Sequence, residues 1–84
     1  MYTVYALHSP KFDKIYIGYT HDISSRLVSH NSLATKGYTI KFRPWILVYT
    51  EEFNIKAEAM KREKELKSHQ GRIFIRNMIK NNSK

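Results

Sequence analysis

Several side chains in this sequence are of the types that hydrolyse a phosphodiester, and they come from different predicted elements. Tyr5 and Tyr16 each lie in a run of strand-forming residues, while Arg26 and His30 lie one helical turn apart in a segment with helical spacing. Glu63 lies in a second helical segment nearer the C-terminus. A phenol can accept a proton, an arginine can bind a phosphate and a carboxylate can hold a metal ion. If the fold brings these groups into one pocket, phosphodiester hydrolysis has the parts it requires.

Arg26, His30 and Glu63 also break the hydrophobic pattern of the segments that contain them. Arg26 and His30 lie on or beside an apolar stripe, and Glu63 lies within one. Burial of a carboxylate is unfavourable unless the group is paired or binds a metal. One interpretation is therefore an internal salt bridge, for example between Glu63 and Arg26, with Lys67 one turn away. The two tyrosines have a similar alternative, since strand aromatics commonly pack a sheet.

The first elements that must position these side chains form a predicted hairpin. Residues 2–7 and 14–20 are rich in strand formers and are separated by a segment of turn composition, which indicates two antiparallel strands. Gly18 lies inside the second strand. A glycine at such a position often marks a bulge or a close approach of another group to the backbone.

A helix over residues 22–34 is expected next, with Asp22 or Thr20 as its N-cap. An irregular connection over 35–44 follows. The apolar run in residues 45–50 then predicts a third strand, central and buried in the sheet.

Two further helices complete the chain, over about 55–68 and 72–80, separated by a break at Gln70 and Gly71. The predicted order is β-β-α-β-α-α, an α+β fold with a small, largely antiparallel three-stranded sheet flanked by helices. We expect residues 1–80 to form a single domain and residues 81–84 to be a frayed tail.

Composition narrows the function. The chain has 84 residues, no cysteine, 15 Lys and Arg against 7 Asp and Glu, and a net charge of +8. The lack of cysteine excludes a disulfide scaffold, a thiolate zinc site and a cysteine nucleophile. No apolar run is long enough to span a membrane, so we expect a cytoplasmic protein. The positive charge favours an anionic partner, and nucleic acid suits the basic C-terminal segment better than a membrane surface, because that segment lacks a strong apolar face.

Taken in order, these residues resemble the motifs of the GIY-YIG nuclease family. Thr3-Val4-Tyr5, with Thr-Val in place of Gly-Ile, is followed after ten residues by Tyr16-Ile17-Gly18. Arg26 and His30 match the pair on the family's first helix, and Glu63 matches its metal-binding glutamate. The resemblance covers nearly the whole chain. It is close to the small stand-alone members, which are similar to the N-terminal nuclease domain of the C component of excinuclease ABC, a DNA repair enzyme.

The resemblance implies a nuclease that uses one divalent cation, Mg²⁺ or Mn²⁺, bound by Glu63 together with water and a phosphate oxygen. It implies that Arg26 contacts the scissile phosphate. Either Tyr5 or Tyr16 would accept the proton of the attacking water, and of the two we favour Tyr5. A free phenol has a pKa near 10, so nearby cations are needed to make the phenolate accessible. His30 would share a proton with the tyrosine or bind the phosphate.

Basic residues around the pocket are expected to bind the nucleic acid, which we take to be DNA recognised by shape rather than by sequence. The candidates are Lys36, Lys41, Arg43, Arg62, Lys67, Arg72 and Arg76. Tyr38, Phe42 and Trp45 could stack on bases or pack in the core. Many family members carry an asparagine on the final helix, and Asn77 is the nearest candidate for it. Its alternative is a plain polar helix residue.

Three hypotheses for the function follow. The first is a metal-dependent endonuclease. The second is a non-catalytic nucleic-acid-binding module on a nuclease fold, and the third is a small basic domain of a protein complex. The complete polar set favours the first, because a pure binding module has no need of an enclosed glutamate.

Overall fold

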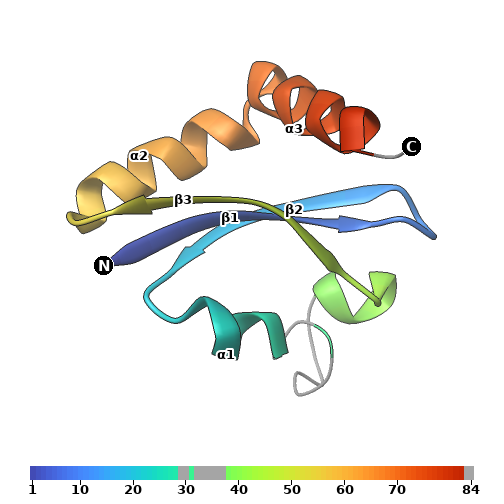
Figure 1. Cartoon of the computed structure of the whole chain (residues 1–84), viewed down its shortest axis with the longest axis horizontal. Helices are drawn as coiled ribbons and strands as arrows, with labels where there is room; N and C mark the ends of the chain where they lie inside the picture. Colours follow the sequence, from blue (N-terminus) through green and yellow to red (C-terminus); the bar gives the residue numbers. More distant parts are fainter. Residues whose placement is uncertain (29–30, 32–37, 83–84) are drawn as a thin grey trace.

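A three-stranded sheet with strand order β2-β1-β3 organises the molecule, and both of its pairings are antiparallel. The structure is a computed structural model that describes residues 1–28, 31 and 38–82. In chain order its elements are β1 (Tyr2–Ser9), β2 (Lys14–Thr20), α1 (Ile23–Val28), the 3-10 helix η2 (Tyr38–Phe42), β3 (Ile46–Phe53), α2 (Lys56–Lys67) and α3 (His69–Asn82). Helices α2 and α3 cover one face of the sheet, and α1 and η2 lie on the other (Figure 1). The predicted α+β class and element order are confirmed.

The β1–β2 hairpin positions both candidate tyrosines. Its register pairs Tyr5 with Gly18 and Leu7 with Tyr16, and because paired residues share a face, all four lie on the face that carries α1. Asp13 in the turn has a φ of 52°, a left-handed conformation that Asp adopts more readily than most residues.

β1 is the central strand of the sheet. Residues 4–7 are all buried, with alternate side chains on opposite faces, because helices cover both faces of this strand. β3 lies at an edge and leaves Ile46 51% and Leu47 37% exposed. The predicted third strand is therefore present, but the prediction that it is central and buried is wrong. An apolar run indicates a strand, but its place in the sheet depends on pairing with distant residues.

Each face of the sheet has its own hydrophobic cluster. The cluster beneath α2 and α3 consists of Val4, Ala6, Ile15, Ile17, Ala59, Leu66 and Ile75. The cluster on the α1 face has Tyr5, Leu7 and Trp45 at its centre, with Tyr16, Ile23, Leu27 and Phe42 packed against them. Trp45 is only 3% exposed, so it packs in the core rather than offering its ring to a base. The two tyrosines therefore belong to the smaller, aromatic cluster.

Helix α1 begins after Asp22, one of the two N-cap candidates that the sequence offered. The Asp22 carboxylate accepts hydrogen bonds from the Ser25 main-chain N–H at 3.1 Å and from the Ser25 hydroxyl at 2.9 Å. The Thr20 hydroxyl oxygen accepts the Asp22 main-chain N–H at 3.1 Å. Helix α1 extends to Val28, and the remainder of the predicted helix, apart from Asn31, lies outside the described residues.

Asn31 ties the chain after α1 to the start of β3. Its Nδ2 donates to the Trp45 carbonyl at 3.1 Å, and its Oδ1 accepts the Trp45 N–H at 2.7 Å. These two bonds satisfy both main-chain groups of Trp45 and hold its ring in the aromatic cluster.

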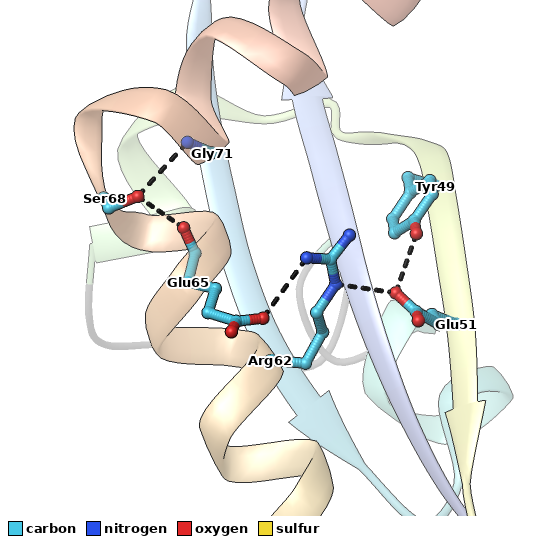
Figure 2. Close-up of polar contacts among 6 residues, drawn as sticks. All are labelled: Tyr49, Glu51, Arg62, Glu65, Ser68 and Gly71. Carbon is cyan, nitrogen blue, oxygen red and sulfur yellow. Dashed lines mark hydrogen bonds and ion pairs between the residues drawn. The ribbon is translucent and has the colours of Figure 1, made fainter.

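Helices α2 and α3 meet at Ser68, whose hydroxyl donates to the Glu65 carbonyl and accepts the Gly71 N–H at 3.2 Å (Figure 2). A Cβ at Gly71 would collide with the backbone of Glu65 and Leu66, so glycine permits the close approach of the two helices. The predicted break at residues 70–71 is wrong, because α3 already begins at His69 and includes this glycine. It continues to Asn82, two residues into the segment that we assigned to the tail. No helix in the described ranges has the length and apolar character needed to cross a bilayer.

Candidate active site

The Tyr5 side chain is enclosed within the α1 face of the sheet, with only 2% of the residue exposed. It lies against its cross-strand partner Gly18, where an added Cβ would collide with the Tyr5 phenol. The Tyr16-Ile17-Gly18 segment therefore does two things. It supplies the second tyrosine and makes room for the first.

Tyr5 and Tyr16 form a contacting pair of phenols. Their ring centroids lie 6.2 Å apart, and a side-chain hydrogen bond links them. The Tyr16 ring also contacts Trp45 edge-on, with centroids 6.3 Å apart. Tyr16 is partly exposed, whereas Tyr5 is buried, so Tyr16 is the member of the pair that faces solvent.

Charges from helices on both faces of the sheet act on Tyr5. Burial is the main cause that raises the pKa of Tyr5 far above its usual value, and the neighbouring Tyr16 adds to the increase. The Arg26 guanidinium acts to lower the pKa of Tyr5, and the Glu63 carboxylate acts to raise it. Burial prevails, so Tyr5 keeps its proton at physiological pH. Arg26 from α1 and Glu63 from α2 thus both lie within electrostatic reach of the buried phenol.

Arg26 reaches this site from the solvent side. Its side chain is exposed, and with Thr20, His21, Asp22 and Ser25 it lines a shallow groove at the start of α1. An exposed guanidinium beside a groove can bind a phosphate without displacing a structural partner. His30, predicted to act beside Arg26, lies outside the described residues.

Glu63 is largely enclosed, with its side chain 18% exposed. It lies on the sheet-facing side of α2 between Ala59 and Leu66, both of which are buried. The Lys67 Nζ lies 3.5 Å from a Glu63 carboxylate oxygen, an ion pair across one helical turn. The salt bridge considered from the sequence therefore forms with Lys67, and the described residues contain no ion pair between Glu63 and Arg26.

A metal ion could find only part of its coordination shell in this protein. Within residues 1–28, 31 and 38–82, no three His, Asp or Glu side chains form a ready-made cage. Glu63 offers one enclosed carboxylate. Such a donor fits Mg²⁺, which usually retains water and is completed by substrate phosphate oxygens, and does not fit a closed structural site.

Arg62, predicted to bind nucleic acid, lies in an ion-pair network between α2 and β3 (Figure 2). Its Nε donates to Glu51 at 2.8 Å, Tyr49 donates to the same Glu51 oxygen at 2.8 Å, and the Arg62 Nη1 reaches Glu65 at 3.3 Å. Burial acts to raise the pKa of Glu51, but the hydrogen bonds from Tyr49 and Arg62 hold it below its usual value. The network was missed from the sequence. Its only local signal is that Tyr49 and Glu51 are two residues apart, on one face of a strand.

The other predicted binding residues are spread over the surface. Arg76 forms a 2.9 Å ion pair with Asp13 at the hairpin turn, which links α3 to β1 and β2. The Arg72 Nε donates to the Lys67 carbonyl at 3.3 Å. Lys41 and Asn77 are exposed, and Arg43 is partly buried. Lys36 lies outside the described residues.

The arrangement is that of a small α+β domain with a tyrosine pair in its sheet and an arginine and a glutamate supplied by flanking helices. Residues 1–77 match the sequence profile of the GIY-YIG catalytic domain. The chain therefore belongs to the GIY-YIG family, a superfamily of nucleases that act on nucleic acid and generally use divalent metal ions.

Relatives of this chain are small stand-alone GIY-YIG proteins of the UPF0213 group. The UPF0213 protein SH2523 of Staphylococcus haemolyticus is 43% identical over 58 residues, which are 69% of this chain and 71% of that protein. SSP2268 of Staphylococcus saprophyticus is 45% identical over the same shares. The solution NMR structure of the UPF0213 protein BH0048 from Bacillus halodurans is 32% identical, covers 93% of this chain and 85% of its own, and superposes with a TM-score of 0.55.

Proposed function

We propose that the protein is a divalent-metal-dependent endonuclease that hydrolyses phosphodiester bonds in DNA and recognises the shape of its substrate. One observation carries the proposal. Arg26 and Glu63, from helices on opposite faces of the sheet, both act electrostatically on the buried Tyr5 of a hydrogen-bonded tyrosine pair. A cation and an enclosed carboxylate near phenols are the groups that phosphodiester hydrolysis needs.

Tyr16 is the better candidate for the residue that accepts the proton of the attacking water. It is partly exposed, so that the attacking water can reach its hydroxyl, whereas Tyr5 is buried. This choice differs from our preference for Tyr5 from the sequence. Tyr5 then acts as a positioning residue, because its hydrogen bond to Tyr16 orients the second phenol.

Arg26 would bind the scissile phosphate. Its guanidinium is always charged, and its planar fork of donors matches phosphate oxygens. The proton of the attacking water would pass to Tyr16. His30 would share that proton or add a second contact to the phosphate.

Glu63 is the residue that would hold the metal ion, Mg²⁺ or Mn²⁺. When bound, the cation would act as a Lewis acid on the phosphate and stabilise the leaving oxygen. The enclosed position of Glu63 supports this role, because a carboxylate there is unfavourable unless a cation lies beside it. The Lys67 Nζ lies 3.5 Å from the Glu63 carboxylate, and the lysine would move aside to contact the substrate when a metal ion binds.

Substrate binding would rest mainly on phosphate contacts. The net charge of +8 supports an anionic polymer as the substrate. Lys41, Arg43, Arg72 and Arg76 remain candidate contacts, as does Lys36. We place the activity in the cytoplasm, where such a substrate would be found.

A second candidate function is a non-catalytic nucleic-acid-binding module. The ion pair between Glu63 and Lys67 favours it, since a glutamate already neutralised within its own helix has a structural role without any metal.

A cleavage assay separates the two candidates. Labelled duplex, single-stranded, flapped and three-way-junction substrates, made of DNA and of RNA, are incubated with the full chain in Mg²⁺, Mn²⁺ or EDTA. We expect cleavage of at least one DNA structure with metal and none in EDTA. Binding of all substrates without cleavage of any, in either metal, would establish the non-catalytic candidate instead.

A further inference from the structure

A continuous row of aromatic rings runs from the tyrosine pair to the tip of the β1–β2 hairpin. Tyr16 contacts Trp45, with centroids 6.3 Å apart, and Trp45 contacts Phe42 at 6.4 Å. Phe42 in turn contacts Phe12 of the hairpin turn, edge to face, at 5.4 Å. The row begins in the core at Tyr5 and ends in solvent, because Phe12 is 41% exposed. The hairpin tip is thus fixed mechanically to the candidate active site.

Lysine side chains lie over the outer rings of this row. The Lys11 Nζ lies 5.6 Å from the centroid of Phe12, and the Lys14 Nζ lies 5.6 Å from that of Phe42. Lys41, next to Phe42 in η2, is exposed as well. Positive charge is therefore gathered around an exposed aromatic ring, at the end of the molecule away from α1.

The one acidic residue of the turn is already neutralised. Asp13 accepts hydrogen bonds from Arg76 at 2.9 Å and from His8 at 3.2 Å, and the Arg76 Nη2 also donates to the Asp13 carbonyl at 3.3 Å. The Arg76 guanidinium, aided by His8, holds the pKa of Asp13 below its usual value. These contacts pin the turn to α3 and leave the lysines to act on an outside anion.

We propose that the hairpin tip is a binding site for an unpaired strand of nucleic acid, with a base stacked on Phe12 and phosphates bound by Lys11, Lys14 and Lys41. An exposed aromatic ring among lysines is the arrangement that binds single strands without sequence preference. A paired base has its faces covered within the helix and cannot stack on a protein ring. The inference rests on the proposed function. It specifies the substrate as one in which an unpaired strand adjoins the cleaved bond.

The row also sets the length of strand that this site requires. Contacts of 6.3, 6.4 and 5.4 Å separate Tyr16 from Phe12. A stacked strand advances about 3.4 Å per nucleotide, so an unpaired segment of roughly five nucleotides is enough to reach from one to the other. Affinity should rise with the length of the unpaired segment up to about this length and then level off.

The test measures binding by fluorescence anisotropy in EDTA, with duplexes that carry 0, 2, 4, 6 or 8 unpaired nucleotides, as DNA and as RNA. The variant is Phe12→Ala, with Phe12→Trp as the conservative replacement. The matched control is Phe74→Ala. Phe74 is 43% exposed, contacts Tyr49 edge-on at 5.6 Å and lies beneath Arg62 at 6.0 Å, but it projects from α3.

We expect Phe12→Ala to weaken binding of the six-nucleotide substrate by roughly 5- to 100-fold. Blunt duplex should change less than about twofold, and Phe12→Trp should bind at least as well as the wild type. Equal effects of Phe12→Ala and Phe74→Ala would overturn the proposal, as would equal losses on blunt and overhanging substrates. A loss confined to the DNA or to the RNA series supports it and identifies the polymer.

Two further measurements keep the result interpretable. The fluorescence of a 2-aminopurine base in the unpaired segment should change when the wild type binds, and should change less when Phe12→Ala binds. The double variant with Lys11→Ala and Lys14→Ala should have a smaller slope of log affinity against log salt concentration on the overhanging substrate, by about 1.4. An unchanged slope contradicts the phosphate contacts.

If the wild type cleaves DNA but its binding shows no dependence on Phe12, only this inference fails. If it binds through Phe12 but cleaves nothing, the proposed function fails.

Discussion

The hydroxyl of Tyr5 lies directly over Gly18, so that a Cβ at position 18 would lie 2.7 Å from the Tyr5 Oη and 2.9 Å from its Cζ. The two residues are cross-strand partners in the hairpin. The absence of a side chain at one position thus determines where the phenol of the other can lie. Because Tyr5 is hydrogen-bonded to Tyr16, the glycine also fixes the geometry of the tyrosine pair.

Gly18→Ala should therefore reduce both stability and cleavage. The added methyl must push a buried tyrosine ring, and overpacking of this kind costs about 1–3 kcal/mol. In a Tyr5→Phe background the same change should destabilise less, because the closest clashing atom is gone. Urea denaturation of the four proteins gives the comparison. An equal effect in both backgrounds would show that the close contact at position 18 has no energetic consequence.

Tyr16→Phe and Tyr5→Phe should have different effects on catalysis. Both should fold, since each loses only a hydroxyl. Tyr16→Phe removes the proposed proton acceptor and should lower single-turnover cleavage by about 100-fold or more. Tyr5→Phe should retain more activity than Tyr16→Phe, with an altered pH profile. Full activity in both variants would show that the two tyrosines only pack against the sheet.

The Asp13 ion pair should make stability depend on pH. The Arg76 hydrogen bond is the main cause that lowers the pKa of Asp13 in the folded protein, so the carboxylate stabilises the fold above its unfolded pKa. That contribution is lost as the pH falls through the folded pKa. The melting temperature of the wild type should exceed that of Asp13→Asn at neutral pH, and the difference should shrink towards zero as the pH falls below the ordinary range of an aspartate carboxyl. Asn tolerates the left-handed backbone at this position.

A second carboxylate variant, at a residue without an ion pair among the described residues, is the control for this experiment. Glu52→Gln changes an exposed residue of β3 for which no ion pair is present in the described part of the chain. Its melting temperature should follow that of the wild type at every pH. A constant difference between wild type and Asp13→Asn from neutral to acid pH would contradict the linkage.

Local pattern was sufficient to predict the hairpin, the Asp22 cap and the sheet-facing position of Glu63, because each depends on residues close in sequence. The edge position of β3 could not be predicted in this way, since it depends on the pairing of β1 with both of its neighbours. Gly71 was interpreted as a helix break, but its reason lies in the backbone of α2 that it contacts.

The candidate site likewise contains residues that the sequence could indicate and contacts that it could not. Tyr5, Tyr16, Arg26 and Glu63 were identified from residue types, spacing and family resemblance. The β3 partner of Arg62 could not be identified, because Glu51 lies eleven residues away on a strand. The aromatic row to Phe12 joins two separate segments, and no local periodicity connects them.

We propose that Glu63 binds the metal ion and does not stabilise the fold. The variant Glu63→Gln tests this role most directly. Cleavage in Mg²⁺, DNA affinity in EDTA and the melting temperature are measured for the wild type, Glu63→Gln and Lys67→Met. We expect Glu63→Gln to lose cleavage by roughly 100-fold or more while DNA affinity and melting temperature hold or rise. Lys67→Met breaks the same ion pair but keeps the carboxylate, so it should still cleave. Retained cleavage in Glu63→Gln, or an equal fall in melting temperature in both variants with no difference in cleavage between them, would contradict the metal-binding role.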